Sequence, residues 1–148
     1  MPTLTASHVI NRPPAEVWAI VADYARDPEW RKGVETMAPS APGPVTAGLT
    51  TDEILHLGGR TYRNAGVVTA VEPGARFAWR TTSGADADGS RTVRDLGDGR
   101  SEVTLVLTVR PHGVERLLQP ILMRMLRSGL AADLGRLAQL ASSDVVAA

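Results

Sequence analysis

The sequence predicts an α+β fold in which a curved, seven-stranded antiparallel sheet packs around one long C-terminal helix, with two short helices after the first strand. Apolar residues alternate with a period of two through much of residues 49–110, as in half-buried strands. Gly58-Gly59, Pro73-Gly74 and Asp98-Gly99 separate these segments and favour tight turns. Residues 114–141 instead place apolar side chains three or four residues apart, which is typical of an amphipathic helix.

The N-terminal third is predicted to form one strand followed by two short helices. Residues 3–11 favour a strand whose even positions are the more apolar. A helix is expected over 14–24, because proline is tolerated in a first helical turn, where its missing N–H is not needed. A second helix is expected over 28–33, after the break at Asp27-Pro28.

The remaining strands follow from alternation and from the breaks between them. Residues 38–48 hold three prolines and two glycines, so this stretch is expected to be a loop. The Gly- and Asp-rich residues 84–89 are expected to be a second loop. In the last helix, Pro120 should kink the helix or mark its true start. The predicted strands are 34–37, 49–57, 60–72, 75–82, 90–96 and 101–110.

This order of elements predicts an internal cavity. A sheet of seven strands must twist and coil, and its apolar face needs a cover. A helix of about 28 residues spans roughly 42 Å but is only about 10 Å wide. One such helix is too narrow to fill the concave face, even if the two short helices close one end. The space left between sheet and helix should be mostly apolar with a few polar anchors.

Composition excludes several classes of function. The 16 basic and 16 acidic residues cancel, which argues against a dedicated binder of nucleic acid or of anionic membranes. Cysteine is absent and the three histidines, at 8, 56 and 112, lack zinc-ligand spacing, so we expect no metal and no cofactor. No apolar run is long enough to span a bilayer, and the first residues do not resemble a signal peptide. We therefore expect a cytoplasmic protein.

Five short segments carry a family resemblance, in the same order along the chain. They are residues 10–18 (INRPPAEVW), 27–30 (DPEW), 71–79 (VEPGARFAW), 97–104 (GDGRSEVT) and 117–120 (LLQP). Together they resemble the START-like superfamily, also called SRPBCC or polyketide cyclase/dehydrase-like. The resemblance implies a single domain over 1–148 with the helix-grip fold, in which the sheet holds the C-terminal helix around a ligand cavity. The superfamily includes lipid carriers, hormone and flavonoid binders, aromatase/cyclases and stress-response proteins, so the fold does not settle the function.

The polar and aromatic candidates each have two interpretations. His8 shares its strand face with Leu4 and Ile10. It either enters the cavity as a hydrogen-bond donor or acid/base group, or it bonds a neighbouring backbone group or lies near the rim. Tyr62 either anchors a ligand through its hydroxyl or packs outward. Trp30 lies at the cavity mouth or plugs it.

Apart from Arg94, the remaining candidates are apolar and either line the expected cavity or pack in the core. Phe77 and Trp79 share one face of their strand, and Leu105 and Leu107 lie on an aliphatic face of the last strand. Arg94 either enters the cavity to bind a carboxylate or faces solvent. The candidate ligand-binding residues are His8, Trp30, Tyr62, Phe77, Trp79, Leu105, Leu107, Leu122, Met125 and Leu126.

Three functions remain open from the sequence. The first is binding of a small hydrophobic or aromatic metabolite, which the aliphatic walls favour. The alternative is a polyketide cyclase, aromatase or dehydratase in which His8 and Tyr62 move protons. The third is a protein-interaction module, which would need a broad exposed apolar patch on the sheet. The sequence lacks the common nucleophile and phosphate-binding motifs, so no catalytic residue is assigned. Whether the chain forms a homodimer is left open.

Overall fold

A computed structural model describes residues 2–147, with side-chain surroundings described as far as residue 143. Strands and helices follow one another in the predicted order. The strands are β1 (Thr3–Ile10), β2 (Val34–Pro39), β3 (Thr50–Leu57), β4 (Arg60–Glu72), β5 (Arg76–Ser83), β6 (Ala87–Gly97) and β7 (Arg100–Val109). The helices are α1 (Pro14–Val21), the 3-10 helix η1 (Tyr24–Arg26), α2 (Asp27–Trp30), the 3-10 helix η2 (Gly113–Arg116) and α3 (Gln119–Ala147).

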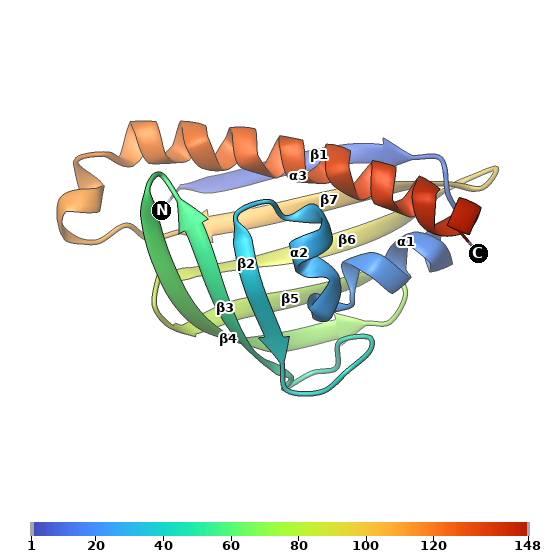
Figure 1. Cartoon of the computed structure of the whole chain (residues 1–148), viewed down its shortest axis with the longest axis horizontal. Coiled ribbons are helices and arrows are strands. Elements are labelled where there is room, and N and C mark those ends of the chain that lie inside the picture. The colour runs from blue at the N-terminus through green and yellow to red at the C-terminus, as the bar shows by residue number, and fades with distance from the viewer. Residues whose placement is uncertain (1, 148) are drawn as a thin grey trace.

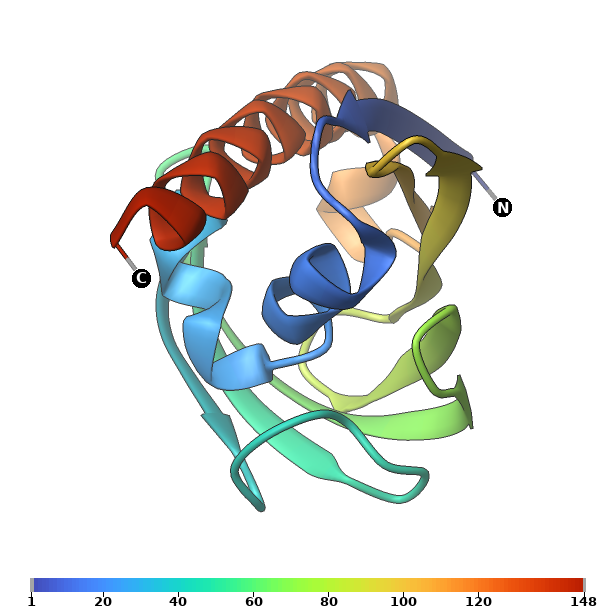
Figure 2. The same cartoon turned by 90° about the vertical axis from the view of Figure 1, so that its right-hand side faces the viewer.

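The seven strands form one antiparallel sheet in the order β1-β7-β6-β5-β4-β3-β2. The sheet curls strongly, and α3 lies across its open side next to β1 (Figure 1). Viewed from the end, the sheet curls beneath α3, with α1 and α2 nearest the viewer (Figure 2). The predicted architecture is therefore confirmed. No helix within residues 2–147 has the length and apolar character needed to cross a membrane.

The predicted start of β6 is wrong by three residues. The loop expected over 84–89 ends early, because β6 already begins at Ala87 and its residues pair with Val109, Thr108 and Leu107 of β7. Gly89 belongs to the strand for a steric reason. A Cβ added there would lie 2.2 Å from the carbonyl oxygen of Val106 and 2.9 Å from the Trp79 ring. Glycine at this position thus reflects close packing within the sheet rather than a turn.

The helix boundaries also differ from those expected. The first helix ends at Val21 instead of residue 24, and the chain continues as η1. The long helix begins at Gln119, not at residue 114, and Pro120 lies in its first turn. A missing N–H costs nothing at that place, so this proline marks the start of α3 rather than a kink. The helix also extends beyond the expected end at 141, as far as Ala147.

The hydrophobic core occupies only one half of the space between sheet and helix. Buried side chains from α1, α2, the sheet and the C-terminal half of α3 pack together there. Among the fully buried members are Val17, Val21, Trp30, Phe77, Val103, Leu134 and Leu137. The N-terminal half of α3 contributes no buried residue before Leu134. The fold thus leaves the first half of α3 over a part of the sheet that the core does not fill.

Candidate functional site

A cavity of about 970 Å³ lies between the inner face of the sheet and the first half of α3. Near α2 the cavity is lined by buried residues, which include Trp30 and Arg91. Along α3 its lining residues are exposed, and these include Arg124, Ser128 and Gly129. The opening therefore lies beside α3. Met125 contacts the β3–β4 hairpin there, since a Cβ added to Gly58 would lie 2.9 Å from its Cε atom.

Aliphatic side chains form the wall between β7 and α3. Leu105 and Leu107 project from β7, and Leu122, Leu126 and Leu130 project from α3. Leucines recur on this face of α3 because positions three and four residues apart share one side of a helix. The wall can remove the apolar surface of a ligand from water, but it offers no group that forms or breaks bonds.

The end of the cavity near α2 is polar, and Arg31 is at its centre. Arg31 Nη1 donates to Asp27 Oδ2 and to Glu53 Oε2, each at 2.9 Å. Asn64 Nδ2 donates to the other oxygen of Glu53 at 3.0 Å. Burial opposes the charge on Arg31, but the carboxylates of Glu53 and Asp27 outweigh it and raise the pKa of this guanidinium. Arg31 is therefore a permanent cation at the cavity surface.

Two donor groups at this end have no acceptor. Arg31 borders the cavity, and its Nε and Nη2 form no hydrogen bond within residues 2–147. The indole Nε1 of Trp30 is buried and likewise unpartnered in the described part of the chain. A buried donor without an acceptor, as at Trp30, is costly. The free Arg31 donors are not buried, because its side chain is 22% exposed, so a ligand oxygen or a water can reach them.

Arg91 on β6 lies behind Arg31 and supports the polar end. Its guanidinium is nearly fully buried and pairs with Asp27 at 2.6 Å. It also lies over the rings of Tyr24, Trp30 and Phe77, with 4.8 to 5.5 Å between Cζ and the ring centroids. Burial also raises the pKa of Tyr24, from 10.0 to about 12, so the folded protein favours the neutral phenol.

Tyr62 lines the cavity from β4 and links the sheet to η2. Its hydroxyl donates to Glu115 Oε1 at 3.3 Å, and Arg60 Nη1 donates to the same oxygen at 2.9 Å. Partial burial and the nearby Glu115 carboxylate raise the pKa of Tyr62. The tyrosine is thus held in its protonated form, able to donate a hydrogen bond.

The structure brings most of the sequence-predicted residues to one cavity. Those that line it are Trp30, Tyr62, Trp79, Leu105, Leu107, Leu122, Met125 and Leu126. Phe77 does not line it; it is fully buried in the core and makes edge-to-face contacts with Trp18 and Tyr24.

Of the two interpretations of His8, the cavity position, on which it was a candidate ligand-binding residue, is wrong. The histidine is exposed and does not line the cavity, although Leu4 and Ile10 on the same face are buried. It lies on β1, which forms one edge of the sheet and pairs with β7. A side chain at the margin of a sheet can reach solvent even from the inner face. Arg94 also stays outside, where it pairs with Glu102 at 2.8 Å.

Sequence reasoning missed the charged residues of the polar end. A signal for Glu53 was present, because it shares strand parity with Leu55 and Leu57, which were expected to face inward. Arg91 similarly shares parity with the buried Val93. A charged residue on an otherwise apolar strand face indicates a buried partner. No local pattern, however, links Arg91 to Asp27, which lies 64 residues earlier.

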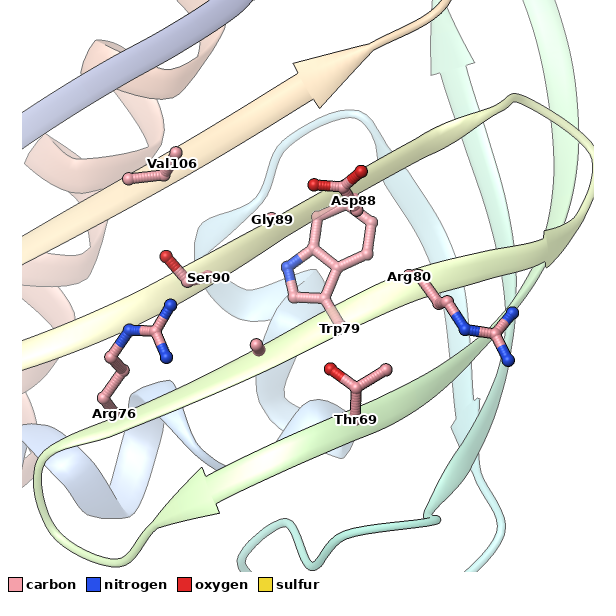
Figure 3. Close-up of a pocket in the computed structure, with 9 residues that line it drawn as sticks. Thr69, Arg76, Trp79, Arg80, Asp88, Gly89, Ser90 and Val106 are labelled. Atoms are coloured by element: carbon pink, nitrogen blue, oxygen red, sulfur yellow. The ribbon is translucent and has the colours of Figure 1, made fainter.

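A smaller hollow of about 380 Å³ lies on the outer face of the sheet (Figure 3). Arg76 and Arg80 flank it, and the Trp79 ring lies across β6 at Gly89 (Figure 3). Trp79, Ser90 and Val106 border both this hollow and the inner cavity. The inner cavity is the better candidate for a binding site, because it is larger and has aliphatic walls.

The sequence was compared with models of protein families and with curated proteins. A family model described as polyketide cyclase / dehydrase and lipid transport matches residues 1–142. A search of curated proteins finds no match.

Solved structures with the same fold are numerous. The Zhui aromatase/cyclase from Streptomyces sp. R1128 has a TM-score of 0.82 at 14% identity, covering 97% of this chain and 95% of its own. TTHA0849 from Thermus thermophilus has a TM-score of 0.82 at 18% identity, covering 97% and 99%. A START superfamily protein from Mycobacterium smegmatis has a TM-score of 0.68 at 15% identity, covering 93% and 98%. At these identities the likeness shows the fold alone.

Proposed function

Because the chain belongs to the polyketide cyclase / dehydrase and lipid transport family, we propose that it binds a small hydrophobic or aromatic molecule in the cavity beneath α3. Membership confirms the resemblance to the START-like superfamily, and it supports a ligand-binding or cyclase role without naming a substrate. The observation that carries the proposal is the cavity of about 970 Å³. This volume is in the range that ligand pockets have in proteins.

The lining suggests the chemistry of the ligand. An apolar body, aliphatic or aromatic, suits the leucine wall formed by Leu105, Leu107 and Leu126. An oxygen acceptor at one end of the molecule suits the free donors of Arg31. Because Asp27 and Glu53 already balance the charges of Arg31 and Arg91, a neutral hydroxyl or carbonyl oxygen fits this end better than a second carboxylate.

Two glycines of α3 allow a matched test of the site. A Cβ added to Gly129 or to Gly135 meets nothing within 4 Å, but only Gly129 lines the cavity. Gly129→Phe should fill the cavity without disturbing the fold, whereas Gly135→Phe leaves the cavity open. The probe is N-phenyl-1-naphthylamine, a neutral aromatic compound whose fluorescence rises when it leaves water.

We expect the wild-type protein and Gly135→Phe to bind the probe with similar affinity. Gly129→Phe should bind it at least about tenfold more weakly, a loss of roughly 1.4 kcal/mol, because the phenyl ring takes the space of the ligand. Absence of binding by the wild-type protein, or equal binding by both variants, would contradict the proposal.

A second candidate function is a cyclase or dehydratase reaction on a polyketide-like chain. The observation that favours it is the Tyr62 hydroxyl at the cavity wall, bonded to the Glu115 carboxylate. A phenol and a carboxylate in contact can pass a proton to and from a bound substrate. His8 has no part in this candidate, because it lies outside the cavity.

The two candidates predict different results for Tyr62→Phe. If the protein is a cyclase, this variant should still bind the naphthylamine probe but lose turnover of a linear poly-β-ketone thioester. If the wild-type protein binds the thioester and leaves it unchanged, the chain is a binding protein and the enzymatic candidate is excluded.

A further inference from the structure

An exposed apolar surface lies on η2 and the first turns of α3, next to the opening of the cavity, which Met125 also lines. Five large hydrophobic side chains there are between 36% and 81% exposed: Val114, Leu117, Leu118, Ile121 and Met125. Among the side chains described, through residue 143, Val9 on β1 is the only other large hydrophobic one that is exposed. Such a cluster is unusual on a protein surface and marks an interaction site. In Figure 1 this segment, coloured orange, projects beyond one end of the sheet.

The exposed surface continues into the cavity. Ile121 and Met125 are four residues apart and so lie on one side of α3, and Leu117 precedes the helix in the turn after η2. Leu122 and Leu126, each one residue later in sequence, line the cavity. An apolar path therefore leads from the outside of the protein, around the side of α3, to the binding site.

Three arginines accompany these apolar side chains on η2 and α3, and one of them, Arg124, also borders the cavity. Arg116, Arg124 and Arg127 are exposed, and their side chains have no hydrogen-bond or ion-pair partner within residues 2–147. Residues 111–128 contain a single acidic residue, Glu115, and it is already engaged by Arg60 and Tyr62. The chain as a whole has a net charge of zero, so this local positive excess is invisible in the overall composition.

We propose that this η2–α3 surface docks on an anionic lipid bilayer. The exposed apolar side chains would enter the boundary between headgroups and acyl chains, while the arginines pair with lipid phosphates. A second copy of the chain fits less well, because a two-fold contact through this surface would bring the arginines of both copies together. Docking places the opening of the cavity next to the bilayer, and the proposal does not depend on which molecule the cavity holds.

Vesicle co-sedimentation tests the proposal with the full chain. The vesicles are phosphatidylcholine mixed with phosphatidylglycerol, and phosphatidylcholine alone. We expect binding to the mixed vesicles, weaker binding to the neutral ones, and loss of binding at high salt. Leu117→Glu combined with Ile121→Glu should abolish binding. Arg116→Glu combined with Arg127→Glu should weaken it at least about tenfold, because each change removes a cation that attracts the anionic surface and adds a negative charge there.

Matched variants elsewhere on the surface act as controls. Val9→Glu places a charge on the exposed hydrophobic residue outside the η2–α3 surface. Arg76→Glu combined with Arg80→Glu makes the same change in net charge on the outer face of β5. Both controls should bind mixed vesicles as the wild-type protein does.

Three results would overturn the proposal. The first is no sedimentation of the wild-type protein with mixed vesicles at low salt. The second is an equal loss of binding in the controls, which would show a general charge effect. The third is a wild-type dimer in solution that the double variant at Leu117 and Ile121 converts to a monomer, without vesicle binding by either form. That outcome would identify the surface as a homodimer interface.

Discussion

The guanidinium of Arg91 holds the carboxylate of Asp27 in a two-point ion pair inside the core, with N···O distances of 2.9 and 2.6 Å. This pair joins β6 to α2, a helix of only four residues. Arg31 binds the same carboxylate from the side of the cavity. One buried aspartate therefore positions both the short helix that carries Trp30 and the arginine that supplies free donors to the site.

We predict that Asp27→Ala strongly destabilises the protein. The substitution leaves Arg91 buried without its counter-charge, which typically costs about 3 to 5 kcal/mol. Urea unfolding followed by circular dichroism measures the change. As a control, Glu102→Ala removes the partner of the exposed Arg94 and should cost no more than about 1 kcal/mol. Equal and small losses in the two variants would show that the buried pair does not hold α2 in place.

Stability should fall at alkaline pH because of Tyr24. Its pKa is raised from 10.0 to about 12 in the folded protein, mainly by burial. The folded state therefore favours the neutral phenol, and this contribution is complete below pH 10 and is lost as the pH rises through 12. The two-unit shift corresponds to about 2 to 3 kcal/mol.

Urea unfolding between pH 9 and pH 12 measures this effect, with Tyr24→Phe as the matched variant. The free energy of unfolding should decline more steeply in the wild-type protein than in the variant. Absorbance of the phenolate should in parallel show that Tyr24 ionises later than an exposed tyrosine. Identical pH profiles for the two proteins would rule out Tyr24 as the source.

The free donors of Arg31 should make the cavity prefer ligands that carry an oxygen. We expect 2-naphthol to displace the naphthylamine probe at lower concentration than naphthalene does, because only naphthol offers an acceptor. Arg31→Lys keeps a positive charge near Asp27 and Glu53 but removes Nε and Nη2. The preference for naphthol should shrink by about fivefold to tenfold, the worth of about one hydrogen bond. An unchanged preference would place the oxygen elsewhere in the cavity.

Local patterns in the sequence sufficed for the sheet, for the long helix and for the aliphatic wall of the cavity. Strand alternation indicated which leucines face inward, and helical spacing placed Leu122 and Leu126 together on the cavity side. The family resemblance implied the way these elements combine. His8 shows the limit of such patterns, because its parity matched the buried face while its place on an edge strand leaves it exposed.

The polar end of the cavity could not be predicted in the same way. It depends on contacts between distant segments, such as Arg91 with Asp27 and Arg31 with Glu53. No periodicity encodes those pairings. The exposed apolar surface on η2 and α3 was not predicted from the sequence for a related reason. The helical pattern alone does not show which apolar residues lie beyond the edge of the sheet. Pro120 indicated where α3 starts. Only the structure shows that the side chains of Leu117 and Ile121 are exposed on the protein surface.

A crystal structure of the protein grown with 2-naphthol would show directly whether the cavity binds an aromatic ligand. We expect the naphthalene rings between Leu105 of β7 and Leu126 of α3, with the hydroxyl oxygen within hydrogen-bond distance of Arg31 Nε or Nη2. A cavity filled by its own side chains, or one left without naphthol at saturating concentration, would contradict this expectation.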